Sequence, residues 1–83
     1  MTELDKIVQD IAKLFTKQKN TLYAVRIIYE PYSDEVNIFF EYHKIGFATT
    51  SKQVGRLNGS YREKLSVIKQ ELQQRTKLTV TTN

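Results

Sequence analysis

The sequence predicts a small α+β domain, formed by a single unit of 83 residues, with the element order α-β-β-β-α and an optional last strand. Three observations support this fold class. Apolar residues recur at a three-four spacing near the start, which is typical of a helix with one buried face. Two alternating β-branched and aromatic stretches flank a turn segment, which indicates a β-hairpin. A capping box at Ser60 and Glu63 opens a second helical pattern. We expect both helices to pack on one face of an antiparallel sheet.

The first helix is predicted over residues 3–19. Its apolar stripe consists of Leu4, Ile7, Val8, Ile11, Leu14 and Phe15. Asn20 is a suitable terminator, because asparagine tolerates the left-handed backbone that often follows a helix.

The hairpin is predicted over residues 22–30 and 35–43, joined by the turn 31–34. A four-residue loop pairs Tyr29 with Val36, Ile27 with Ile38, Val25 with Phe40, and Tyr23 with Tyr42. These eight side chains then share one face, which we expect to be the core. The other face receives Leu22, Ala24, Arg26, Ile28, Asn37, Phe39, Glu41 and His43. Arg26 and Glu41 stand on a diagonal of this mixed face, where opposite charges can meet.

The rest of the chain is less regular. We expect a short third strand at residues 47–50 and an irregular segment at 51–59, because that segment contains Gly55 and Asn58-Gly59. The second helix starts at Ser60 and fades near Arg75. Its apolar stripe is Tyr61, Leu65, Ile68 and Leu72. Residues 78–82 alternate and are rich in threonine, so they can add a short edge strand.

The residues argue against catalysis and metal binding. There is no cysteine, and His43 is the only histidine, so a nucleophile-base pair or a zinc site lacks its parts. The segment 55–59 lacks the Lys-Ser/Thr of a phosphate-binding loop. We therefore predict no enzyme, no cofactor and no metal. The absence of a signal-peptide core and of any apolar run near ~20 residues favours a cytoplasmic protein without a membrane partner.

Charge is unevenly divided along the chain. Residues 1–43 carry five basic and seven acidic side chains, whereas residues 44–83 carry eight and two. A one-sided basic surface attracts polyanions or acidic proteins, although a solvated surface is an equally good interpretation. Five basic residues around the third strand and the second helix are candidates for contacting phosphates: Lys44, Lys52, Arg56, Arg62 and Lys64.

The mixed face of the hairpin supplies the candidates for protein binding: Arg26, Phe39, Glu41 and His43. An aromatic side chain on an open sheet face can anchor a protein partner or stack on a nucleobase. The alternative is that the third strand, the tail strand or a dimer mate covers Phe39. An exposed tail strand could also pair with its copy and form a homodimer.

Two family layouts are similar to this one. The order helix, three strands, helix resembles a double-stranded-RNA-binding domain, in which the start of the last helix grips phosphates. Residues 51–56 would correspond to that region. The chain also resembles antitoxin or immunity proteins of the YezG type, found in firmicute bacteria and phages. The similar parts are residues 7–12, the aromatic-rich residues 35–42 and residues 76–80.

The second resemblance implies a small protein that neutralises or regulates another by binding it. We therefore expect a non-catalytic bacterial or phage accessory protein that modulates a protein partner. The alternative is a basic module that contacts nucleic-acid phosphates through residues 44–64.

Overall fold

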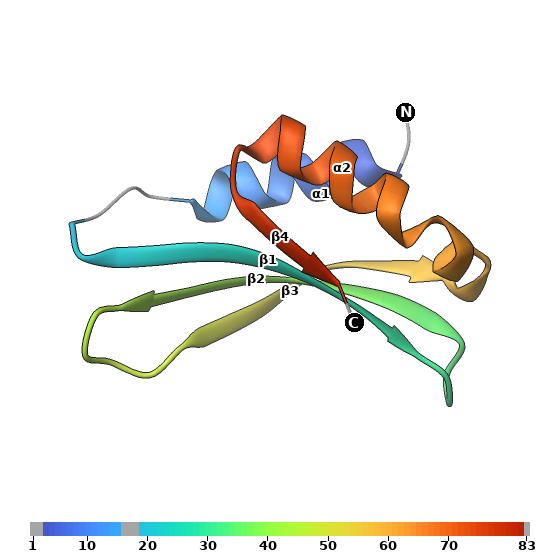
Figure 1. Ribbon diagram of the computed structural model, residues 1–83, viewed down its shortest axis with the longest axis horizontal. Helices are drawn as coiled ribbons and strands as arrows, with labels where there is room; N and C mark the ends of the chain where they lie inside the picture. The colour runs from blue at the N-terminus through green and yellow to red at the C-terminus, as the bar shows by residue number, and fades with distance from the viewer. Residues whose placement is uncertain (1–2, 16–18, 83) are drawn as a thin grey trace.

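A computed structural model describes residues 3–15 and 19–82 and confirms the predicted α+β class. In chain order, the elements are α1 (Glu3–Leu14), β1 (Thr21–Glu30), β2 (Glu35–Lys44), β3 (Thr50–Asn58), the 3₁₀ helix η1 (Gly59–Lys64), α2 (Leu65–Thr76) and β4 (Thr79–Thr82). The strands form one layer, and α1 and α2 lie on one face of it (Figure 1). The opposite face, called here the open face, carries no helix among these residues.

The sheet has the strand order β3-β2-β1-β4. The first three strands are antiparallel, as predicted. The tail does form a strand, but it runs parallel to β1, so the sheet is mixed rather than wholly antiparallel. The direction follows from the connection: β3 runs the same way as β1, α2 brings the chain back across the sheet, and β4 therefore starts in the direction of β1.

The β1–β2 hairpin has the predicted register. Tyr29 lies opposite Val36, and Val25 lies opposite Phe40. Each strand is one residue longer than expected at its open end, where Thr21 pairs with Lys44. The alternation of apolar and polar residues was sufficient to predict this register, because side chains alternate strictly between the two faces of a sheet. A slip by one residue would turn the whole apolar set to solvent.

The core lies between the hairpin and the helices. Alternate residues of β1 and β2 supply its floor, and both helices supply its cover. The buried set is Ile7, Ile11, Val25, Ile27, Val36, Ile38, Phe40, Leu57, Ile68, Leu72 and Val80. The described part of the chain buries no polar or charged residue completely. Burial of these apolar side chains is the main favourable term that holds the two layers together.

The third strand is present, but its predicted bounds of 47–50 are wrong. β3 occupies Thr50–Asn58, so the segment 51–59 that was predicted to be irregular is mostly strand. Phe47 belongs to the turn before it. Gly55 indicated a loop, yet it lies in the strand, close to Ile7 of α1: an added Cβ would lie 2.5 Å from Cγ1 of Ile7 and closer still to its Cδ1. A register shift against Ile38 and Phe39 leaves Val54 as the extra residue of a β-bulge.

The helix boundaries also differ from the prediction. α1 ends at Leu14 rather than near residue 19, and residues 16–18 of the predicted extension lie outside the described residues. The second helical segment begins as η1, whose cap is Asn58 and not Ser60: the Asn58 side chain accepts a hydrogen bond from the Ser60 backbone N–H at 2.9 Å. Asn20, predicted to end the first helix, does not do so, because α1 ends at Leu14; its left-handed backbone, with φ 58°, belongs to the turn before β1.

Candidate functional site

The open face carries all four residues that the sequence indicates for protein binding. Arg26, on β1, and Phe39, Glu41 and His43, on β2, alternate with core residues and therefore project away from the helices. Because no helix covers this face within the described residues, it is the natural place to look for a binding site.

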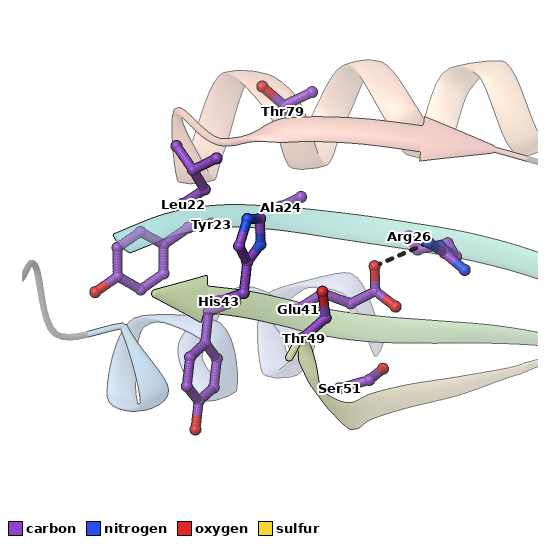
Figure 2. A pocket seen from close by; sticks show the side chains of 10 residues that line it. Leu22, Tyr23, Ala24, Arg26, Glu41, His43, Thr49, Ser51 and Thr79 are labelled. Atoms are coloured by element: carbon purple, nitrogen blue, oxygen red, sulfur yellow. Dashed lines mark ion pairs between the residues drawn. The ribbon is translucent and has the colours of Figure 1, made fainter. Parts of the chain in front are cut away.

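A groove of about 700 Å³ crosses the open face where β1 begins and β2 ends (Figure 2). Its lining comes from all four strands and the turn before β3: Leu22, Tyr23, Ala24, Arg26, Glu41, Tyr42, His43, Thr49, Ser51 and Thr79. Three of the four predicted residues are thus brought together in one hollow. Small hydroxyl-bearing residues form its outer walls, with Thr49 and Ser51 on one side and Thr79 on the other.

The groove combines apolar surface with a charge pair. Leu22 is 56% exposed and lies opposite His43 in the register. Arg26 Nη2 lies 3.2 Å from Glu41 Oε1, and the Glu41 side chain is only 16% exposed. This confirms the predicted diagonal pair. Glu41 is largely removed from water whereas the Arg26 side chain is 48% exposed, so desolvation of the carboxylate offsets part of the attraction between the two charges.

Phe39 lies beside the groove rather than in it. It pairs with Arg26 on one side and Gln53 on the other, and it is partly buried. Of the two covers predicted within the chain, β3 is adjacent to the strand of Phe39, whereas β4 lies beyond β1. A substitution here tests the open face outside the groove.

The remaining part of the open face is occupied by polar contacts between side chains. Arg56 Nε lies 2.7 Å from Glu35 Oε2, and Gln53 Nε2 donates to Asn37 Oδ1 at 2.9 Å. These side chains use each other as partners across β2 and β3. This half of the face offers fewer free groups to a ligand than the groove does.

The five candidates for phosphate contact do not form one patch. Arg56 pairs with Asn37, seven residues along β2 from Lys44, so about 24 Å separates their backbones. Lys52 is opposite the core residue Phe40 and therefore projects on the helix side of the sheet, whereas Arg56 projects on the open face. The fold thus distributes these charges over different faces and both ends.

Arg62 and Lys64 lie in η1, near the β1–β2 turn. There the Tyr29 hydroxyl donates to Asp34 Oδ1 at 2.7 Å, and Arg62 Nη1 lies 3.4 Å from the same oxygen. The hydrogen bond to Asp34 raises the pKa of Tyr29, with partial burial and the Asp34 charge acting in the same direction and Arg62 opposing them. Arg62 is therefore engaged by an acid, and the cluster holds η1 against the hairpin turn.

The β2–β3 turn lies where the sequence predicts a turn, at Lys44-Ile45-Gly46, and it exposes two large apolar side chains. Ile45 is 62% exposed and Phe47 is 68% exposed. Gly46 permits the sharp turn, with a φ of 92°. Phe47, predicted as the first residue of the third strand, belongs instead to this turn, because β3 begins only at Thr50.

The described residues contain no group of three or more histidine, cysteine or carboxylate side chains placed to hold a metal. No helix in residues 3–15 and 19–82 is long and apolar enough to cross a membrane. Comparisons of the chain with protein-family models, with curated proteins and with solved structures found no match.

Proposed function

We propose that this chain is a non-catalytic interaction protein that binds and modulates a protein partner through the groove on the open face. The observation that carries the proposal is a bare sheet face with a hollow that combines exposed Leu22, the Arg26–Glu41 pair and His43. Surface regions that combine apolar contact area with a few fixed polar groups are typical of recognition sites.

The groove suggests how the partner is selected. A side chain seated on Leu22 and Ala24 would bury apolar area, which supplies affinity. The same contact would remove the rest of Arg26 and Glu41 from water, so a partner without complementary polar groups is penalised. The polar threonine and serine walls suit a rim that accepts hydrogen bonds.

A cytoplasmic location and a bacterial, phage or mobile-element origin belong to the same proposal. They rest on the sequence expectation and on the resemblance to YezG-type antitoxin and immunity proteins, which act by binding another protein. Binding another protein needs no cofactor and no catalytic group, so the groove is compatible with that mode of action.

Site-specific photo-crosslinking tests the proposal. A photo-reactive amino acid at Ser51 should crosslink one protein in a bacterial lysate, whereas the same group at Gln70, on the exposed side of α2, should not. Leu22→Lys should abolish the crosslink, and Phe39→Ala should weaken it while cooperative unfolding persists. Equal crosslinking from Ser51 and Gln70, or insensitivity to Leu22→Lys, would contradict the proposal.

The alternative proposal is contact with nucleic-acid phosphates through the region 44–64. It is supported by the exposure of Lys44, Lys52 and Lys64, and weakened by the ion pairs that engage Arg56 and Arg62. Fluorescence anisotropy with labelled single- and double-stranded DNA and RNA at two salt concentrations separates the two. Binding that falls steeply with salt would favour this alternative over the groove.

We also propose that the chain forms a homodimer through the exposed edge of β4. The outer edge of β3 carries a bulge and charged residues, which protect an edge strand, whereas Thr79–Thr82 contains neither charge nor proline. Thr81→Lys should turn any dimer seen by sedimentation equilibrium into a monomer. A wild-type chain that remains monomeric at high concentration would remove this part.

A further inference from the structure

The turn between β2 and β3 is called here the hairpin tip, and it is distinct from the turn of the β1–β2 hairpin. It consists of residues 44–49, with Lys19 and Asn20 beside them. The Ile45 backbone N–H donates to the Asn20 carbonyl at 2.7 Å, and the Phe47 N–H donates to the Lys44 carbonyl at 2.8 Å. Gly46 permits the sharp turn at φ 92°. The side chains of the tip are thus presented on a held backbone.

The tip is apolar at its end. Ile45 is 62% exposed and Phe47 is 68% exposed, and Leu22, which is 56% exposed, lies one residue from the strand end where Thr21 pairs with Lys44. Contiguous exposed apolar patches mark protein or membrane interaction sites, and Ile45 and Phe47 are two residues apart in one turn. At the left of Figure 1 the tip stands near one end of the longest dimension, which measures 38 Å.

The exposed charged side chains at the tip are basic. Lys44 Nζ lies 5.7 Å from the centroid of the Phe47 ring, and Lys19 is exposed beside Asn20. The sequence has no acidic residue between Asp10 and Glu30 or between Glu41 and Glu63. Glu41 is already engaged by Arg26. An anionic partner is therefore favoured.

We propose that the hairpin tip docks on the surface of an anionic lipid bilayer. Phe47 and Ile45 would enter the boundary between headgroups and acyl chains, and Lys19 and Lys44 would face the lipid phosphates. A lysine near an anionic leaflet is attracted to it, and apolar side chains that reach the interface add to the binding. Surface docking needs no spanning segment, so the proposal revises the sequence expectation of no membrane partner.

Other occupants fit the tip less well. Nucleic acid would use the lysines and could stack on Phe47, but Ile45 and Leu22 would have no role in a phosphate contact. A second copy docked tip to tip would bring Lys19 and Lys44 of both chains together, which like charges oppose. A protein partner is better served by the neighbouring groove, because the tip is convex.

Cosedimentation with vesicles provides the test. Vesicles of phosphatidylcholine with about 30% phosphatidylserine should bind the full chain at low salt, binding should fall as salt screens the lysines, and pure phosphatidylcholine should bind weakly. Phe47→Ala should reduce the partition coefficient about tenfold, and Lys44→Gln about fivefold. The matched controls are Tyr32→Ala and Lys64→Gln: Tyr32 is 99% exposed in the opposite β1–β2 turn, and Lys64 is exposed in η1.

The absence of cysteine in the chain allows a second measurement that does not depend on affinity. An environment-sensitive fluorophore on Ala48→Cys should shift to the blue when anionic vesicles are added, whereas the same label on Ser33→Cys, in the opposite turn, should not. Three results would overturn the proposal: no vesicle binding at low salt, equal losses in tip and control variants, or displacement of the vesicles by duplex DNA with no blue shift at position 48.

Discussion

Gly55→Ala tests the close contact between α1 and β3. Gly55 lies on β3 directly beneath Ile7 of α1, and an added methyl group would overlap the Ile7 side chain, which is 3% exposed. Forcing an extra methyl group into a packed core costs about 1–3 kcal/mol. Replacing glycine by alanine returns roughly 0.4–1 kcal/mol through the unfolded chain. We therefore expect a net destabilisation of about 1 kcal/mol.

The overlap can be relieved, which makes the explanation specific. Ile7→Ala removes Cγ1 and Cδ1 and should itself cost about 2–5 kcal/mol through the cavity. In that background Gly55→Ala should become neutral or slightly stabilising, because its methyl group enters the space that Ile7 vacates. Urea unfolding of the wild type, both single variants and the double variant gives the coupling free energy, which we expect to be about 1 kcal/mol or more and favourable.

Gly46→Ala is the matched control. An added Cβ at Gly46 meets nothing within 4 Å, and its cost comes from the φ of 92°. That cost should be the same with or without Ile7. If Gly55→Ala remains equally destabilising in the Ile7→Ala background, the contact with Ile7 is not its cause, and the proposed reason for glycine in β3 is refuted.

Three further predictions concern single contacts. In a spectrophotometric titration, Tyr29 should ionise above its ordinary range, and Asp34→Asn should lower the pKa of Tyr29. Because the pKa of Tyr29 is raised in the folded protein, the stability linked to it is fully present below the pKa of an unfolded tyrosine, about 10, and is lost as the pH rises through the pKa of folded Tyr29. Lys77→Gly should raise the free energy of unfolding by about 0.5 kcal/mol, since Lys77 caps α2 with φ 63° and glycine avoids that strain; unchanged chemical denaturation would contradict this. A double-mutant cycle on Arg26→Ala and Glu41→Ala should give a coupling near 0.5 kcal/mol that shrinks in high salt, and zero coupling would show that the groove pair is not stabilising.

The hairpin was predictable because all its signals are local. Alternation of apolar and polar residues assigns the faces, and the turn that ends in Asp34 fixes the register, so Val25 opposite Phe40 could be derived without knowing the rest of the fold. The Arg26–Glu41 pair followed from the same register. The charges within the groove were thus foreseen, although the hollow that contains them was not.

The features that could not be predicted from the sequence depend on contacts between residues far apart in the chain. Gly55 indicates a loop until Ile7, 48 positions earlier, is known to occupy the place of its missing side chain. The groove walls are Thr49, Ser51 and Thr79, small polar residues with no recognisable pattern, brought together by the β3 pairing and by the crossover to β4. The direction of β4 depends on where α2 ends, which periodicity alone does not determine.

Pairing β4 with β1 also determines how the sheet can be completed during folding. Ala24 lies opposite Thr79, which is 55 residues later, whereas every β1–β2 contact closes across a four-residue turn. Loop closure delays distant contacts relative to local ones, so the hairpin can form well before β4 arrives. Until then the β1 edge stays unpaired beside apolar Val25 and Ile27, and α2 is not yet anchored by Val80. β1, one of the two central strands of the finished sheet, is therefore an exposed edge while the chain folds.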